Sequence, residues 1–379
     1  MVPLSTNTVC DCGHNISNVI VESFDTRQVF DINEIKLNVT EYQAEVKRCP
    51  VCGQIHTADF PEEVKSKAQY GPRIKALTLY LKHHGFMSYE RIQELCEDWI
   101  GIPISQGTLV NFTNACACDL EPVVEDIKDK LIESDIIHCD ESGIRIMGTL
   151  HWLHVTGNEY FTYYYPHKNR GKVAMDEIGI LPNYTGIVIH DHWDSYYKYE
   201  NCLHSLCNAH HLRELIYFEE NDEKWAEKLK KCLIDAKDEK EDIGITKKRI
   251  KYYKSRFKRL LNEGLKIHPE CKKNKKKRGR QKQSGEHNLL KRLKEKIDDV
   301  LRFITNKQVP FDNNSGERDV RMIKVQQKVS GTFRSIAGAE NFCIIRSYIS
   351  TIKKCGYSVY KVFLGVCQKD ILLPEVIKN

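Results

Sequence analysis

The stretch Asp135-Ile136-Ile137-His138-Cys139-Asp140 decides the fold, and Gly186-Ile187-Val188-Ile189-His190-Asp191 repeats its pattern further along the chain. Both are short apolar runs that end on an acid, which is typical of buried strands. Side chains alternate along a strand, so each acid shares a face with the residue two places before it. If two such strands are neighbours, Asp140 and Asp191 face one crevice.

A divalent cation is one explanation of this pair of acids. Two carboxylates that share a crevice repel each other unless a cation lies between them. Mg²⁺ binds one or two carboxylates together with the phosphates of a substrate. The alternative is that Asp140 and Asp191 are turn formers or helix caps, a common role of aspartate. Strand position alone favours this alternative.

Glu317 is the third candidate acid. It lies in Asp312-Asn313-Asn314-Ser315-Gly316-Glu317-Arg318, where the Asn-Asn-Ser cluster predicts the start of a helix. On that helix the acid heads a stripe that continues with Arg321, Lys324 and Lys328. An acid beside basic residues suits a metal next to a phosphate backbone. A solvated helix face with an ordinary ion pair is the alternative, and spacing alone favours it.

The segments between the two acid-ended runs define the fold class. Strand patterns occupy residues 149–155 and 160–165, and a helix pattern occupies residues 171–181. Three strands, a helix and a further strand in this order predict an α/β layer fold.

The remaining segments are helical in pattern. Residues 61–131 have helical spacing, with Ser105 as the predicted N-cap of one helix. This suits either a DNA-binding helical unit or a plain packed bundle. Residues 207–306 are helical and highly charged, and residues 313–366 are helical with an interruption near Ser330-Gly331.

The N-terminal segment is rich in cysteine and turn residues. Cys49-x-x-Cys52 is a strong zinc half-site because its spacing lets both thiolates reach one tetrahedral ion. Cys10-x-Cys12 is the predicted second half, with a tighter spacing in which His14 could replace either thiol. Alternation at residues 28–46 predicts a hairpin between the two halves. The sequence therefore favours a small zinc ribbon over four unconnected thiols.

Composition limits the class of protein. Hydrophobic content of 41% and charged content of 29% suit a globular chain, and no apolar run is long enough to cross a bilayer. The N-terminus lacks the pattern of a signal peptide, so we expect a cytoplasmic protein without a membrane partner. The 15 cysteines then indicate free thiols, with a subset binding metal. The net charge of +6 is a weak indication of a polyanionic partner.

A basic run at residues 272–282 has no apolar anchor, which predicts a flexible loop. A solvated charge run is the default interpretation of such a segment. In an enzyme that acts on DNA, contact with phosphates becomes the better one, and it would give steep salt dependence with little sequence specificity.

Cys207 and His210 form a C-x-x-H pair just after a predicted strand. Two ligands do not make a zinc site, and the sequence offers no obvious second pair. We therefore favour packing and hydrogen bonding near the acids over metal binding for these two side chains.

Five stretches together resemble the transposases of the insertion sequence 66 family, almost end to end over residues 1–368. The first three are Cys139-Asp140-Glu141-Ser142-Gly143, His190-Asp191-His192-Trp193 with Tyr196, and Cys207-Asn208-Ala209-His210 with Arg213-Glu214. The C-terminal ones are residues 310–318 with 328–335, and Arg346-Ser347-Tyr348-Ile349-Ser350-Thr351. Members usually carry a further region ahead of the zinc module, whereas Cys10 here comes almost at once, so we expect a compact or truncated version.

The resemblance implies a DDE transposase whose catalytic acids are Asp140, Asp191 and Glu317. It implies a ribonuclease H-like core at residues 132–368 with a helical insertion at about 208–306. A zinc ribbon at 1–58 and a helical, DNA-binding domain at 59–131 would precede this core, and a C-terminal tail at 369–379 would follow it. The expected cofactors are two Mg²⁺ or Mn²⁺ ions on the three acids and a structural Zn²⁺ on the N-terminal cysteines.

The resemblance further implies cutting at transposon ends and joining of the freed 3′ hydroxyls to target DNA. The expected partners are double-stranded DNA, a second copy of the chain, and accessory proteins encoded by the same element. A catalytically silent DNA-binding protein and a nuclease on the same fold are the alternatives. The candidate phosphate contacts are Arg318, Arg321, Lys324, Lys328, Lys275, Lys276, Lys277 and Arg278.

Overall fold

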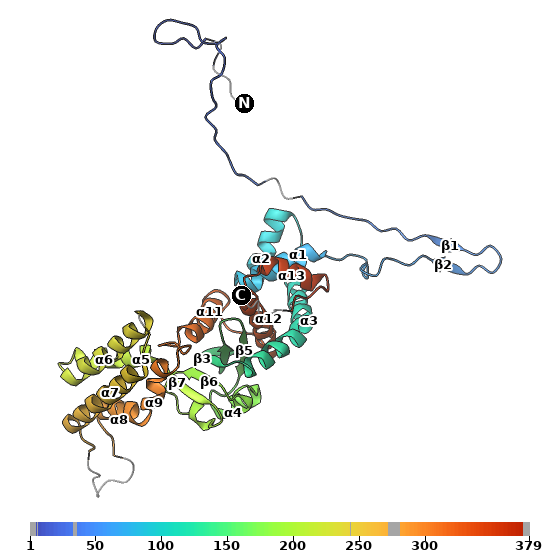
Figure 1. Ribbon diagram of the computed structural model, residues 1–379. Helices are drawn as coiled ribbons and strands as arrows, with labels where there is room; N and C mark the ends of the chain where they lie inside the picture. The colour runs from blue at the N-terminus through green and yellow to red at the C-terminus, as the bar shows by residue number, and fades with distance from the viewer. Residues whose placement is uncertain (1–4, 6, 33–35, 243, 272–280, 374–379) are drawn as a thin grey trace. The chain divides into compact units, whose positions relative to one another are not determined.

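The computed structural model of the protein describes residues 5, 7–32, 36–242, 244–271 and 281–373. The chain divides into two compact units, Met1–Glu41 and Tyr42–Asn379. In the first unit the described residues form turns and an isolated antiparallel bridge between Val9 and Asn15. The helices and strands of the described residues belong to the second unit (Figure 1).

The second unit contains seven strands among its described residues. They are β1 (Val46–Arg48), β2 (Ile55–Thr57), β3 (Ile136–Ile146), β4 (Thr149–Gly157), β5 (Thr162–His167), β6 (Ile187–His190) and β7 (Leu203–Leu206).

Helices before and after these strands complete the unit. They are α1 (Pro72–Leu79), α2 (Tyr89–Leu95), α3 (Gln106–Ile132), α4 (Lys172–Ile178), α5 (Asn208–Glu219), α6 (Lys224–Asp242), α7 (Lys247–Ile267), α8 (Gly285–Glu295), α9 (Ile297–Val300), α10 (Arg302–Thr305), α11 (Asn314–Ser330), α12 (Ile336–Lys354) and α13 (Val359–Cys367). Single π-helical or 3-10 turns lie at Tyr80–His84, Cys96–Ile100, Leu181–Asn183 and Tyr196–Lys198.

The central sheet has five strands in the order β5-β4-β3-β6-β7. Strands β3, β4 and β5 form an antiparallel meander, and β6 and β7 continue the sheet in parallel on the other side of β3. His138 of β3 pairs with Ile189 of β6, so the two acid-ended runs are neighbours, as predicted. The predicted α/β class and the order of three strands, helix and strand are confirmed.

Strand β3 is longer than the sequence predicted. The apolar run ends at Asp140, but the strand continues to Ile146 and pairs with β4 along its whole second half. Met147 and Gly148 join the two strands, both with positive φ (50° and 78°), which is the backbone of a two-residue hairpin turn. Asp140 therefore lies inside a strand instead of at its end, and only Asp191 directly follows one.

The hairpin expected at residues 28–46 is wrong. In the described residues between Gln28 and Glu45 no strand forms, and the side chains of Val29, Phe30 and Val39 are exposed. Alternation predicts a strand only where one face is covered, and nothing covers these residues. The short antiparallel pair β1 and β2 forms instead around the Cys49–Gly53 turn.

Helix α12 covers the outer edge of the sheet at β5. The N–H of Thr162 donates to the Thr351 hydroxyl (3.0 Å), and the N–H of Tyr164 donates to the Ser347 hydroxyl (2.9 Å). The Tyr164 hydroxyl in turn donates to the carbonyl of Asp319 on α11 (2.8 Å). Side chains thus satisfy the backbone donors that an edge strand leaves open.

Helices α5 to α10 occupy the segment between Asp191 and Glu317, and they confirm the helical pattern predicted for residues 207–306. Their core includes Phe257 and Leu261 of α7 and Leu290 of α8, all fully buried. The same core contains Ile189 of β6 and Leu206 of β7. These contacts attach the helical block to the parallel side of the sheet (Figure 1).

The helices before the sheet also follow the sequence pattern. The Ser105 side chain caps α3 by accepting from the N–H of Thr108 (3.1 Å), as predicted. Ile92, Ile104 and Leu109 are buried in a small core formed with α2. None of the described helices combines the length and apolar character needed to traverse a bilayer.

Candidate functional site

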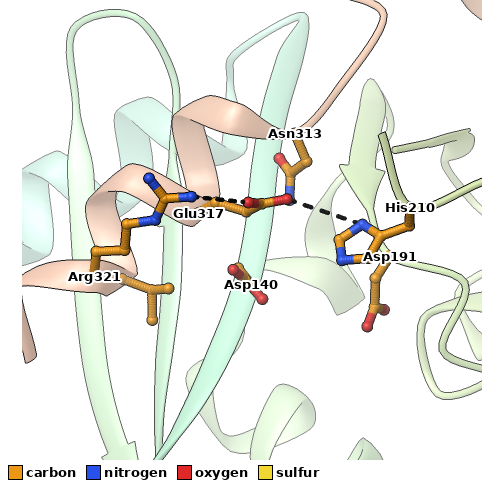
Figure 2. A pocket seen from close by; sticks show the side chains of 7 residues that line it. Asp140, Asp191, His210, Asn313, Glu317 and Arg321 are labelled. Carbon is orange, nitrogen blue, oxygen red and sulfur yellow. Dashed lines mark hydrogen bonds and ion pairs between the residues drawn. The ribbon is translucent and has the colours of Figure 1, made fainter. Parts of the chain in front are cut away.

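The three predicted acids line one cavity of about 250 Å³ (Figure 2). Asp140 comes from the middle of β3, Asp191 from the end of β6, and Glu317 from the first turn of α11. Figure 2 shows Glu317 between Arg321 and His210, with Asp140 below it in this view. The cavity is lined by Asp140, Asp191, His210, Asn313, Glu317, Val320 and Arg321.

The pairing of β3 with β6 brings the two aspartates together. His138 lies opposite Ile189, so Asp140 and Asp191 are each two residues further along neighbouring parallel strands. Residues two apart in a strand share a face, and both side chains leave the sheet on the same side. Asp140 accepts a hydrogen bond from the N–H of Glu141 (2.8 Å), and Asp191 accepts one from the N–H of Trp193 (3.0 Å).

Asn313 fixes the start of α11 against β3. Its side-chain N–H donates to the carbonyl of Cys139 (2.9 Å), and its side-chain oxygen lies 2.8 Å from Nδ1 of His138. Burial lowers the pKa of His138, so the neutral ring donates its Nδ1–H to that oxygen. Because α11 starts here, Glu317 one turn later is held above Asp140.

The negative charge gathered in the cavity favours a cation there. Burial, followed by the charges of Glu141, Asp191 and Glu317, raises the pKa of Asp140 to about 7. A bound divalent cation would remove this penalty, since it neutralises the cluster and stabilises the charged form. Carboxylate oxygens are the ligands that Mg²⁺ and Mn²⁺ prefer, so the chemistry of these side chains suits the ions that the sequence predicts.

The raised pKa of Asp140 predicts how metal-free protein responds to pH. The unfolded chain loses this proton near pH 4 and the folded chain near pH 7, so the folded state binds more protons in between. Stability should therefore fall as pH rises from about 4 to about 7, and Mg²⁺ should reduce the fall. Thermal melts in EDTA at a series of pH values test this prediction. The fall in melting temperature with pH should be larger for wild type than for Asp140→Asn.

The control for the pH experiment is Asp194→Asn, which removes an exposed carboxylate near the cavity. Its melting temperature should track wild type at every pH. The explanation fails if Asp140→Asn also tracks wild type, because the pH dependence then comes from other groups.

Nearby acids have structural partners. The side chain of Glu141 is buried and accepts from the guanidinium of Arg170 (2.6 Å) and from the Tyr196 hydroxyl (2.7 Å). Arg170 lies between the rings of Trp152 and Trp193, so the ion pair is enclosed by aromatic faces. Side chains thus occupy both carboxylate oxygens of Glu141, whereas the hydrogen bond described for Asp140 comes from a backbone N–H.

Basic side chains surround Glu317. The Arg321 guanidinium lies 3.4 Å from Oε2 of Glu317, and that of Arg213 lies 3.9 Å from the same oxygen. Both arginines are exposed and available to a further anion. Lys324 donates to the carbonyl of Gly143 (3.2 Å), which connects α11 to β3.

The other predicted DNA contacts are not at the cavity. Arg318 and Lys328 are exposed on α11 and do not line it. Lys275, Lys276, Lys277 and Arg278 lie outside the described residues. Only Arg321 among the predicted phosphate contacts therefore lines the cavity within the described chain.

The N-terminal cysteines lie in two similar turns. In one, the N–H of Gly13 donates to the carbonyl of Cys10 (2.7 Å), and in the other the N–H of Gly53 donates to that of Cys49 (3.0 Å). The backbone N–H of Cys12 lowers the pKa of Cys10, and that of Cys52 lowers the pKa of Cys49.

These lowered pKa values favour the thiolate form that binds zinc. Cys10 and Cys12 belong to the first compact unit, and Cys49 and Cys52 belong to the second. The four-ligand zinc site therefore stays a prediction.

Sequence reasoning missed the roles of Asn313, His138 and Arg213 at the cavity. Asn313 was interpreted only as part of a helix start. His138 carried a usable signal because it shares the strand face of Asp140. Arg213 carried none, because its approach to Glu317 depends on how the helical block packs on the sheet.

Comparison with protein families gives one further finding. The model of the family described as "Transposase IS66 family" matches residues 67–341, which is more than half of the chain. All seven residues that line the cavity fall within this match. No curated protein gives a significant match.

Proposed function

Because the chain belongs to the IS66 family of transposases, we propose that it cuts transposon ends and joins them to target DNA as a DDE transposase. Membership of this family implies action on DNA, and the acids of the cavity suggest the chemistry by which the protein acts. The convergence of Asp140, Asp191 and Glu317 from three separate elements is the observation that supports the proposal. A cluster of acids that line one cavity is what divalent-metal phosphoryl transfer needs.

The roles of the residues follow from their positions. Asp140 and Asp191 would hold two divalent ions from the sheet, and Glu317 would complete the ligand set from α11. When bound, two such ions activate the attacking hydroxyl and stabilise the leaving oxygen of an in-line displacement. Arg321 and Arg213 would bind a scissile or neighbouring phosphate. No side chain needs to attack, so we expect no covalent protein–DNA intermediate.

The domain scheme is part of the same proposal. The mixed five-strand sheet with acids on its central strands supports a ribonuclease H-like core at residues 132–368, interrupted by a helical insertion at about 208–306. Residues 59–131 would form a helical DNA-binding domain, and 369–379 a C-terminal tail. The paired cysteine turns support a zinc ribbon at residues 1–58. Joining two DNA ends would require a second copy of the chain and accessory proteins of the element.

The basic run is proposed to contact phosphates without reading sequence. Replacing Lys275, Lys276, Lys277 and Arg278 by alanine should make the slope of log affinity against log salt less negative by up to about 3.6, because each lost contact contributes about 0.9. Fluorescence anisotropy at stepped salt measures this slope. The variant should lose the same factor in DNA affinity for transposon-end duplexes as for unrelated duplexes. An unchanged slope would exclude these residues from the interface.

The direct test is Mg²⁺-dependent nicking and strand joining on labelled transposon-end DNA. Joined products that require Mg²⁺ or Mn²⁺ and disappear in EDTA are expected. Cleavage without joining, with accessory proteins present, would instead support a nuclease on the same fold. Tight binding without chemistry under the same conditions would support a catalytically silent DNA-binding protein.

A further inference from the structure

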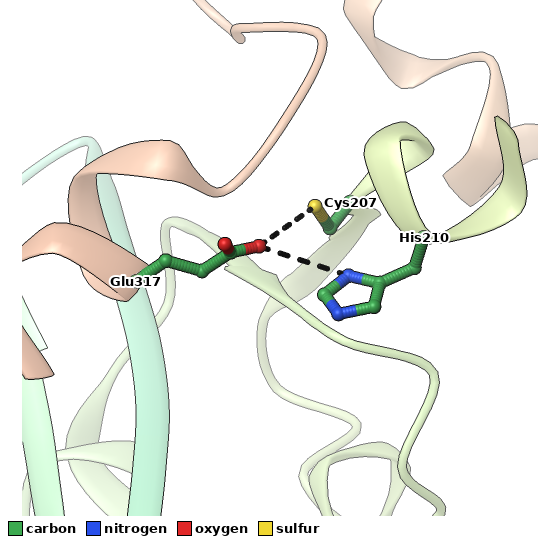
Figure 3. A group of neighbouring side chains, drawn as sticks. All are labelled: Cys207, His210 and Glu317. Carbon is green, nitrogen blue, oxygen red and sulfur yellow. Dashed lines mark hydrogen bonds and ion pairs between the residues drawn. The ribbon is translucent and has the colours of Figure 1, made fainter. Parts of the chain in front are cut away.

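Three metal-binding groups meet beside the cavity (Figure 3). Cys207 follows β7 directly, His210 lies in the first turn of α5, and Glu317 approaches from α11. Oε1 of Glu317 lies 3.8 Å from Sγ of Cys207 and 3.9 Å from Nδ1 of His210. All three atoms lie within 4.8 Å of one another. The C-x-x-H pair thus gains the third ligand that the sequence did not offer.

Burial raises the pKa of the Cys207 thiol, but backbone donors face its sulfur and would partly offset this cost when a metal binds. The sulfur is buried and accepts the N–H of Asn313 (3.2 Å), and the N–H groups of Ala209 and His210 at the start of α5 also face it. Backbone donors at a helix start stabilise a thiolate, which is the form that binds a metal. Backbone N–H groups alone provide this environment, without a second cysteine.

The imidazole of His210 supplies an independent observation. Its Nδ1 is buried and has no hydrogen-bond partner among the described residues, since 3.9 Å to Glu317 is too long for a hydrogen bond. A buried ring nitrogen without a partner costs free energy. Figure 3 shows this nitrogen facing the carboxylate of Glu317, so a cation between them would satisfy both.

The separations match zinc better than magnesium. Zinc ligands lie about 2.3 Å (sulfur) and about 2.0–2.2 Å (nitrogen or oxygen) from the ion, so tetrahedral ligand atoms are about 3.3–3.7 Å apart. The two separations from Glu317, 3.8 and 3.9 Å, require only a small inward movement, and the third pair of ligand atoms lies within 4.8 Å. A thiolate and an imidazole select zinc, whereas Mg²⁺ prefers oxygen alone. His210 is partly exposed, which leaves room for a water as fourth ligand.

We propose that Cys207, His210 and Glu317 form a Zn²⁺ site that shares Glu317 with the neighbouring acids Asp140 and Asp191. The site itself rests on these contacts alone. Its consequence rests on the proposed function: zinc that holds Oε1 of Glu317 withdraws a ligand from the Mg²⁺ cluster and inhibits strand joining. Glu317 would then belong to two metal sites that compete for it.

Zinc content tests the site without any assay of activity. The full chain is loaded with Zn²⁺, desalted and analysed for metal per chain, as wild type, Cys207→Ser, His210→Gln and Cys118→Ser. Cys118→Ser is the matched control because it removes an exposed thiol on α3. We expect one equivalent of zinc fewer in Cys207→Ser and His210→Gln than in wild type, and no loss in the control. Any zinc on the N-terminal cysteines is present in all four proteins, so it does not affect the difference between them.

Circular dichroism and thermal melts establish that each variant is folded. His210→Gln serves as the second variant because its side chain is partly exposed, so its fold should survive if that of Cys207→Ser does not. Zinc content equal to wild type in folded His210→Gln would overturn the site. Loss of one equivalent there supports it, whether or not the protein joins DNA.

The inhibitory consequence is measured separately, as the joining rate in Mg²⁺ with added Zn²⁺. At about ten times the dissociation constant of the site, nearly all chains carry zinc, so the wild-type rate should fall about tenfold. Each variant is compared with its own zinc-free rate, and His210→Gln should fall much less. Equal inhibition of wild type and His210→Gln would overturn the proposed competition between zinc and magnesium for Glu317. The existence of the zinc site would then be decided by the zinc content alone.

Discussion

Replacing Asp191 by alanine is expected to abolish Mg²⁺-dependent joining of transposon-end DNA, by about 10³-fold or more. Asp191 directly follows β6 and shares the cavity with Asp140 and Glu317. Without its carboxylate, one proposed metal position would lose a ligand, and the transition state would lose several kcal/mol of charge stabilisation. DNA binding should change little, because the role proposed for the acids is to hold metal ions. Joining in gels and binding by anisotropy measure the two effects.

Asp194→Ala is the matched control for this experiment. It removes an exposed aspartate three residues further along the same loop, so it changes charge without touching the cavity. Its joining rate should stay close to wild type. If Asp194→Ala loses joining as strongly as Asp191→Ala, the effect comes from the loop or the overall charge, and the role given to Asp191 is refuted.

Replacing Gly186 by alanine should destabilise the fold by about 3 kcal/mol, the upper part of the range for overpacking. A Cβ at this position would lie 2.4 Å from the Tyr184 hydroxyl and 2.6 Å from the carbonyl of Asp135. Neither can move easily, because Tyr184 is fully buried and Asp135 accepts the N–H of Ile187 (2.8 Å). The methyl group would push β6 away from β3 at the base of the site. Urea denaturation followed by fluorescence measures the loss.

Gly71→Ala is the control, since an added Cβ there meets no atom within 4 Å and the backbone φ of −71° suits any residue. Its unfolding midpoint should lie near that of wild type. A midpoint for Gly186→Ala that equals the control would mean that β3 and β6 tolerate separation at this point. The close packing described for the two strands would then not determine stability.

Local apolar patterns predicted much of the fold. The runs that end at Asp140 and Asp191 are recognisable as strands because both are short and apolar, with β6 fully buried and β3 buried on one face. The second half of β3 was missed because its residues pair with β4, and only the paired strand makes the alternation meaningful. The hairpin at residues 28–46 was predicted from alternation alone, without a surface to cover it.

The candidate site was predictable only in part. Strand patterns indicated Asp140 and Asp191, but Glu317 lies beyond the whole helical block, and spacing alone favoured a solvated helix face for it. The resemblance to a family, not periodicity, selected this acid. The approach of Cys207 and His210 to Glu317 was not predictable, because it depends on how α5 and α11 meet. Non-local contacts of this kind leave no trace in the spacing of residues.

The covered edges of the sheet limit how two copies of this chain can assemble. Hydroxyls of α12 occupy the donors of β5, and β7 lies beside α9 and α10, with the Arg302 guanidinium donating to the carbonyl of His204. These contacts oppose extension of the sheet by strand addition, and the same protection lowers the risk of edge-to-edge aggregation. Synapsis of two DNA ends would therefore be built from helical surfaces and from the bound DNA, which can bridge two protomers itself.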